Sequence, residues 1–142
     1  MTSVPAYVLL APETEPPVIS AFNPFRAVVI IEQPVSAAWQ ARISDWLVQS
    51  GCLYMMAWGD NCSAWDDSVD IANLEHFDYG DIPADRDVMT TWHTEDSLDE
   101  VFSFAKHLAS HPIIDLPQIV LVHISTVCKE LEFLQAYDSV KQ

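Results

Sequence analysis

The side chains best suited to chemistry stand where three apolar runs of the sequence end. Glu32 follows the first run, Trp58 and Asp60 end the second, and Trp92 and His93 end the third. Histidine is the usual proton carrier near neutral pH. Carboxylate oxygens are the ligands that hard divalent cations prefer. Tryptophan beside carboxylates can instead anchor a cationic group. These residue types therefore predict either acid–base and metal chemistry or the binding of a cation.

The catalytic hypothesis uses Asp60, Asp67 and His93. In this interpretation Glu32, Asp60 and Asp67 would hold Mg²⁺, and His93 would transfer a proton with an acidic partner. It describes a small metal-assisted hydrolase or transferase. His123 is treated differently, because a histidine inside an apolar strand is typically buried and satisfied by hydrogen bonds.

The binding hypothesis uses Trp58, Asp60, Trp65, Trp92 and His93 as one surface. The chain has 21 acidic and 6 basic residues, so its net charge is −15. Such a field repels nucleic acid and anionic membranes and favours a basic protein or a cationic ligand. This hypothesis describes a non-enzymatic acidic binding module, such as an immunity or accessory protein. Two alternatives stay open: the tryptophans belong to the core, or the chain is a subunit of a larger complex.

Several motifs are missing. Gly51, Gly59 and Gly80 are the only glycines, and the sequence contains neither G-x-G-x-x-G nor G-x-x-x-x-G-K-[ST]. The chain therefore has no glycine-rich loop that could surround a phosphate group. A G-x-S-x-G nucleophile elbow is also missing. No cofactor is expected, apart from the divalent metal of the catalytic hypothesis.

The cysteines and the termini indicate the cellular compartment. Cys52, Cys62 and Cys128 are odd in number and not closely paired, as is typical of reduced thiols. Cys62 is an alternative candidate nucleophile, although a buried structural role is more common for cysteine. No secretory signal or membrane-length apolar run is found. The sequence predicts a cytoplasmic protein.

The elements that must position these residues alternate between strand and helix. Strands are predicted where β-branched and apolar residues run continuously, and helices where apolar residues recur every three or four positions. The predicted strands are 25–32, 52–58, 88–92 and 118–124, and the predicted helices are 36–49, 97–109, 127–140 and one starting at residue 63.

Local signals mark the helix ends. Ser36 is a predicted N-cap, and Gly51 follows the same helix where a left-handed residue is favoured. Ser97 and Glu100 have the spacing of a capping box. Ser63 is predicted to cap the second helix with Asp66 three positions later. Asp66 and its neighbour would then stabilise the positive end of that helix instead of binding metal.

The repeated strand–helix order predicts an α/β fold. We expect a three-layer sandwich of the Rossmann-like or flavodoxin-like kind, with about four parallel strands. Residues 1–24 are predicted to form an N-terminal edge strand and a proline-rich connector, and residues 25–142 a single α/β domain. In open parallel sheets, ligands bind beyond the carboxyl ends of the strands. All the candidate residues would then meet at one rim.

Two segments resemble those of a known family. The first is the pattern C-x5-WG-x2-C-x2-WDD from Cys52 to Asp67, and the second is MTTWH from Met89 to His93. Together with the following EVFSFAKH, they resemble a bacterial family of uncharacterised stand-alone domains over about residues 25–125. The resemblance implies a Rossmann-like fold and no activity. The likeness to immunity proteins is one of small size and acidic composition only.

Overall fold

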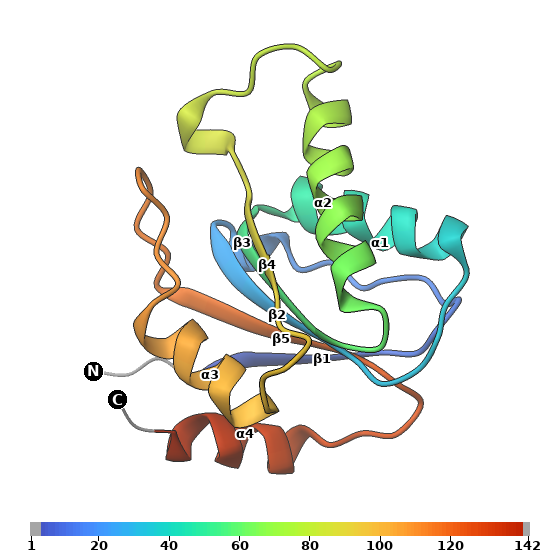
Figure 1. Cartoon of the computed structure of the whole chain (residues 1–142), viewed down its shortest axis with the longest axis vertical. Coiled ribbons are helices and arrows are strands. Elements are labelled where there is room, and N and C mark those ends of the chain that lie inside the picture. Colours follow the sequence, from blue (N-terminus) through green and yellow to red (C-terminus); the bar gives the residue numbers. More distant parts are fainter. Residues whose placement is uncertain (1–3, 141–142) are drawn as a thin grey trace.

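A computed structural model of the chain describes residues 4–140, which form five strands, four α-helices and two short 3₁₀ helices (Figure 1). In chain order the elements are β1 (Ala6–Leu10), η1 (Ser20–Phe22), β2 (Phe25–Ile31), α1 (Ala37–Ser50), β3 (Cys52–Gly59), α2 (Cys62–His76), η2 (Ala84–Arg86), β4 (Met89–Trp92), α3 (Leu98–His107), β5 (Gln118–Ile124) and α4 (Glu130–Ser139).

The five strands make one sheet in the order β1-β5-β2-β3-β4, and every neighbouring pair is parallel. This confirms the predicted α/β class, and β1 is the expected N-terminal edge strand. The central strands are buried because their sequences are continuously apolar: Ala27, Val28, Val29 and Ile30 in β2 have no exposed surface. A parallel sheet of this kind needs cover on both faces.

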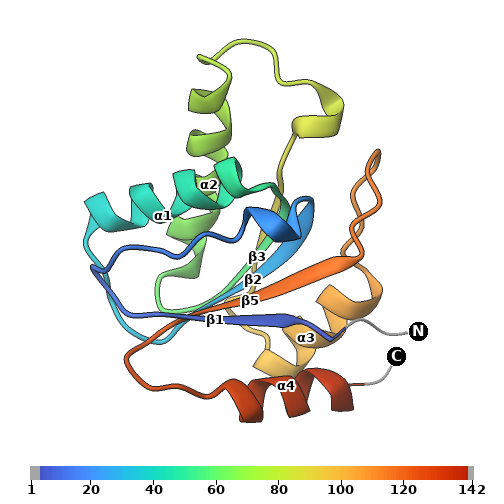
Figure 2. The same ribbon diagram turned by 180° about the vertical axis from the view of Figure 1, so that it is seen from behind.

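Helices supply that cover in two pairs (Figures 1 and 2). Helices α1 and α2 lie on one face of the sheet and α3 and α4 on the other, and the members of each pair contact one another. The face under α3 contains Tyr54 and His93, whose rings both pack against Phe104. Among the described residues, no helix has the length and apolar character needed to cross a membrane.

The proline-rich connector between β1 and β2 lies against α1. Two tryptophans of α1 bind its backbone: the indole nitrogen of Trp39 donates to the carbonyl of Thr14 (2.8 Å), and that of Trp46 donates to Pro17 (2.7 Å). These bonds hold the part of the connector before η1, which has no regular secondary structure. Trp39 and Trp46 are therefore structural residues.

Most of the predicted helix ends are confirmed. The Ser36 side chain accepts a hydrogen bond from the Trp39 amide, and Ser97 and Glu100 form the capping box. Gly51 adopts φ 106° after α1. The prediction for α2 is wrong: this helix begins at Cys62 and not after Ser63. Its N-cap is Asn61 (φ 55°), whose side chain makes no capping hydrogen bond.

The end of β3 requires glycine. Gly59 has φ 109°, and a Cβ atom there would clash with the backbone carbonyl of Ile31 on β2. We expect Gly59→Ala to lower the free energy of unfolding by at least about 2 kcal/mol, because it adds both backbone strain and a clash. Gly80→Ala is the matched control, since its φ is not positive, and should cost under about 1 kcal/mol. Equal urea midpoints for the two variants would contradict this explanation.

Candidate functional site at the carboxyl edge of the sheet

The order of the sheet reverses between β2 and β5. The chain proceeds from β2 to β3 and β4 in one direction, then returns to place β5 on the other side of β2. In open α/β sheets, the carboxyl ends of the strands on either side of such a reversal form the usual ligand crevice. Glu32 follows β2 at this point, and His123 lies near the end of β5.

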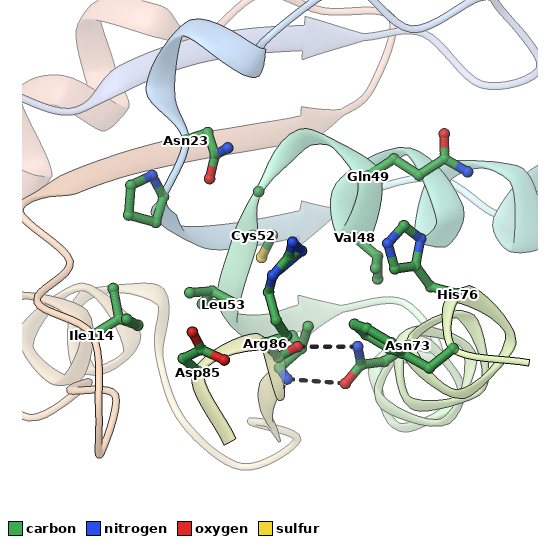
Figure 3. A pocket seen from close by; sticks show the side chains of 14 residues that line it. Asn23, Val48, Gln49, Cys52, Leu53, Asn73, His76, Asp85, Arg86 and Ile114 are labelled. Atoms are coloured by element: carbon green, nitrogen blue, oxygen red, sulfur yellow. Dashed lines mark hydrogen bonds between the residues drawn. The ribbon is translucent and has the colours of Figure 1, made fainter. Parts of the chain in front are cut away.

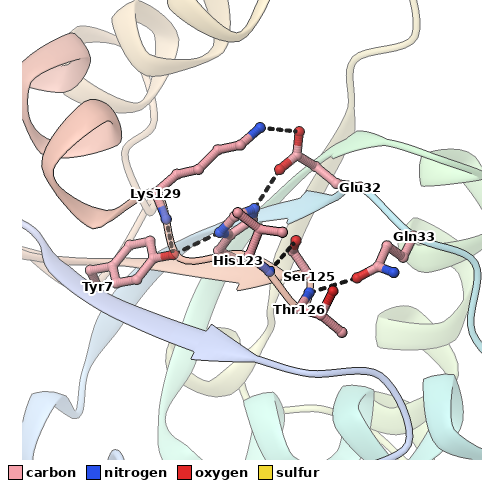
Figure 4. A network of polar contacts seen from close by, with 8 residues as sticks. Tyr7, Glu32, Gln33, His123, Ser125, Thr126 and Lys129 are labelled. Atoms are coloured by element: carbon pink, nitrogen blue, oxygen red, sulfur yellow. Dashed lines mark hydrogen bonds and ion pairs between the residues drawn. The ribbon is translucent and has the colours of Figure 1, made fainter.

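A hydrogen-bonded network fills this position (Figure 4). The hydroxyl of Tyr7 lies 2.7 Å from Nδ1 of His123, and Nε2 of His123 lies 2.6 Å from Oε1 of Glu32. The other carboxylate oxygen of Glu32 is 3.1 Å from Nζ of Lys129. The backbone amide of Lys129 donates to the Tyr7 hydroxyl at 3.1 Å. The network therefore joins β1, β5, the end of β2 and the start of α4.

The charges of this network follow from its contacts. Partial burial acts to raise the pKa of Glu32, but hydrogen bonds from His123 and Lys129 outweigh it, and the net pKa is below the ordinary value. An ionised Glu32 accepts the Nε2 proton of His123. Nδ1 is then left to accept from the Tyr7 hydroxyl. Each polar group of the fully buried His123 has a partner, which confirms the prediction for this residue.

The loops on either side of the reversal are also joined directly. The Thr126 amide donates to the side-chain oxygen of Gln33 (2.6 Å), and the Glu32 amide donates to the Ile124 carbonyl (3.1 Å). Protein groups thus occupy the polar atoms that a ligand would use here. Both oxygens of Glu32 are engaged, so the predicted metal-binding role of this residue has no geometric support. The network holds the fold together.

We predict that Glu32→Gln lowers the free energy of unfolding by about 1–2 kcal/mol at neutral pH, because it keeps the shape but removes the charge from two hydrogen bonds. The pKa of Glu32 is lower in the folded chain than its ordinary value of 4.5. Its contribution is therefore complete above that value and is lost as the pH falls below it.

Denaturant unfolding between neutral and acid pH measures this difference. The matched control is Glu132→Gln, which neutralises an exposed carboxylate of α4. A gap between wild type and Glu32→Gln that stays constant down to the lowest pH at which the chain folds would contradict the assignment.

His93 lies at the end of β4 in a second polar arrangement. Its Nδ1 is 2.7 Å from a carboxylate oxygen of Asp96, and its Nε2 is 2.9 Å from the Thr91 hydroxyl. The indole nitrogen of Trp58 donates to the Asp96 carbonyl (2.9 Å), which fixes the loop. The expected acidic partner of His93 is thus Asp96, three residues later. The sequence signal for this pair is the short loop between β4 and the capping box of α3, because that loop contains Asp96.

The three tryptophans of the binding hypothesis do not share a surface. Trp65 is 1% exposed and belongs to the core, so its predicted binding role is wrong. Trp92 is 51% exposed. The Thr90 side chain hydrogen-bonds to Asp70 of α2, so it lies on the α2 face of the sheet. Because side chains alternate along a strand, Trp92 lies on that same face. Trp58 contacts the loop before α3 on the opposite face.

The acidic candidates are dispersed in the same way. Asp60 and Asp67 are exposed, and within residues 4–140 no hydrogen bond or ion pair joins either of them to His93. No three His, Cys, Asp or Glu side chains of the described chain come together as a metal site. The predicted set of Glu32, Asp60 and Asp67 therefore does not meet as a metal centre.

The edge formed by β4 and α2 is the feature that the sequence did not reveal. The Thr90 hydroxyl donates to a carboxylate oxygen of Asp70 (3.0 Å), and the Val88 amide donates to the Asn73 side chain (3.0 Å). β4 has four residues and, among the described strands, pairs only with β3, so none of them covers its other side. Exposed Trp92 ends this strand. Strand order was needed to recognise this edge, and the sequence alone does not supply it.

The amino edge of the sheet has a separate open pocket of about 370 Å³ (Figure 3). Its walls come from the start of β3 and from the ends of α1 and α2, and the Arg86 side chain reaches across it. Cys52 lies at its base, where burial raises the pKa of the thiol to about 12. The thiol is therefore protonated and unreactive at neutral pH.

Comparison with known families shows to which family the chain belongs. Residues 5–140 match the family model described as Domain of unknown function (DUF7684), and the chain belongs to this family. No curated protein and no solved structure matches it. The resemblance to an uncharacterised family is thus confirmed.

Proposed function

We propose that this protein is a non-enzymatic binding module, in an accessory or immunity-type role, that holds a basic, extended protein segment along the open edge of β4. The observation that carries the proposal is the coincidence at this edge of unpaired backbone groups, the exposed Trp92 and the carboxylates of α2. An extended segment that adds to a sheet edge gains main-chain hydrogen bonds, while flanking side chains give specificity.

The backbone of β4 provides the main-chain groups. The His93 amide donates to the Ala57 carbonyl of β3 at 3.0 Å. Backbone groups alternate along a strand, so Thr91 also faces β3, while the N–H and C=O groups of Thr90 and Trp92 face the open side. An unprotected edge is a template for another strand.

Charge favours a basic partner. The net charge is −15, and four of the six basic residues already bind groups of the protein: Arg26, Arg42, Lys106 and Lys129. The field around the molecule is thus acidic and attracts a cationic segment, with an affinity that falls as salt rises. Trp92, on the same face of the sheet as Asp70, suits a cationic side chain.

The test measures binding of a fluorescent synthetic peptide of alternating lysine and valine. We expect the wild type to bind it at low salt, and Thr90→Pro to weaken binding at least about tenfold, because proline removes an outward N–H and blocks the edge. Trp92→Ala should weaken it by about 1–2 kcal/mol.

Thr90→Val is the matched control, since it retains the backbone N–H and loses only the hydroxyl. It should bind the peptide nearly as well as wild type, and a peptide with glutamate in place of lysine should not bind. The proposal fails if the wild type ignores the lysine–valine peptide, or if Thr90→Pro binds as tightly as Thr90→Val.

The hydroxyl–imidazole–carboxylate order of Thr91, His93 and Asp96 favours a second candidate, a hydrolase or transferase that uses no metal. In it the Thr91 hydroxyl adds to an acyl carbonyl and its proton passes to Nε2 of His93. Asp96 orients the imidazole through Nδ1–H, and the bond from the acyl carbon to the leaving group breaks as that group takes up the proton. Water in a hydrolase, or an acceptor hydroxyl or amine in a transferase, then removes the acyl group from Thr91. The distances of 2.9 and 2.7 Å support this order.

A fluorophosphonate probe tests the second candidate directly. Labelling of Thr91 in the wild type, with loss of labelling in His93→Gln, would support acyl transfer. No label on the wild type, or a label that persists in His93→Gln, would exclude it in favour of the binding module.

A further inference from the structure

Helix α2 runs antiparallel to β4, and polar side chains link the two at regular intervals. Asn73 bonds to the backbone of Val88, and one helical turn earlier Asp70 bonds to Thr90, two residues further along the strand. From residue 73 to residue 66 the helix advances about 10.5 Å, and from residue 88 to residue 92 the strand advances about 13 Å, so the two run nearly in step. Continued by one more step, the same series would set Asp66 level with Trp92.

Asp66 differs from the other two members of the series because none of the described residues hydrogen-bonds to its Oδ1. Asn73 and Asp70 both accept hydrogen bonds from the β4 segment. Asp66 is only 7% exposed, and its Oδ1 is buried without a hydrogen-bond partner in the described structure. A buried carboxylate oxygen destabilises the fold unless a donor pairs with it, and unpaired groups of this kind are uncommon in native proteins.

The surroundings of Asp66 define the donor that is missing. Burial raises the pKa of Asp70, and repulsion from Asp66, Asp67 and Asp87 adds to this, so several carboxylates lie near one another. On the sheet beneath, the residue paired with Trp92 is Ala57, which is small. A cationic donor suits a group of carboxylates of this kind. A metal is not indicated, since no three ligating side chains of the described residues converge.

We propose that the Asp66 carboxylate is the specificity site of the β4 edge and takes the guanidinium of an arginine in the docked segment, with Trp92 against its flat face. This inference rests on the proposed function and adds to it the side chain that is recognised. Arginine suits the site better than lysine because its planar donors pair with a carboxylate while its face stacks on an indole.

Isothermal titration with a matched pair of peptides tests the inference. Both peptides alternate threonine and valine between lysine ends, and they differ only in a central arginine or its uncharged isostere citrulline. We expect the wild type to bind the arginine peptide about tenfold more tightly. Asp66→Asn should abolish that preference, while Asp67→Asn, one position away and exposed on α2, should retain it.

The outcomes separate the two proposals. If the wild type binds both peptides equally, or if Asp66→Asn keeps the arginine preference, Asp66 is not the specificity site, although the edge still binds a strand. If the wild type binds neither peptide, the strand-binding function itself fails. Far-ultraviolet circular dichroism and thermal unfolding of each variant establish that it is folded. Should Asp66→Asn be unfolded, Asp66→Glu, which displaces the carboxylate but keeps its charge, must reduce the preference for the inference to stand.

Discussion

The structure depends on one constraint: a parallel sheet buried on both faces leaves its backbone polar groups no route to water except at its edges. The continuous apolar sequences of β2 and β5 make this burial complete at the centre of the sheet. Every polar side chain that enters the layer must then find a partner inside the protein. Two buried polar atoms of the described residues, Oδ1 of Asp66 and Nε of Arg26, lack such a partner.

At the reversal of the strand order, this need for hydrogen-bond partners inside the protein is met completely. Tyr7, His123, Glu32 and Lys129 satisfy one another, and the Gln33 side chain joins the two loops. The position where many α/β proteins bind a ligand is here occupied by the protein's own side chains. This explains how a conventional architecture can lack the glycine-rich loops of dinucleotide-binding proteins.

At β4 only some of the polar groups have a hydrogen-bond partner among the described residues. Asn73 and Asp70 accept hydrogen bonds from the β4 segment, while within residues 4–140 Oδ1 of Asp66 and the outward backbone of the strand have no partner. The exposed Trp92 lies at the same end. Burying these groups against a basic segment would complete the hydrogen bonding that the isolated domain lacks. The acidic charge of the chain would bring such a segment to the edge.

The sequence predicted the parts of this molecule that depend on local chemistry. The β-branched run of β2, the capping box of Ser97 and the glycine after α1 each have a local physical cause, and each was confirmed. The site depends on strand order and on the face that each residue occupies. Trp65 and Trp92 are equivalent as residue types, yet one is buried and the other exposed.

Side chains alternate between the two faces along neighbouring strands, and this places Trp58 and Trp92 on opposite faces of the sheet. The sequence alone predicts one rim that holds both. The missing partner of Asp66 had no sequence signal at all. It follows from the register between α2 and β4, which only the three-dimensional arrangement reveals.

The openness of the β4 edge can be measured directly by amide hydrogen exchange in the free protein. Thr91 and His93 should exchange slowly, because their amides face β3, whereas Thr90 and Trp92 should exchange rapidly. Protection of Thr90 and Trp92 equal to that of Thr91 and His93 would mean that this edge is already covered, and would contradict the proposed binding surface.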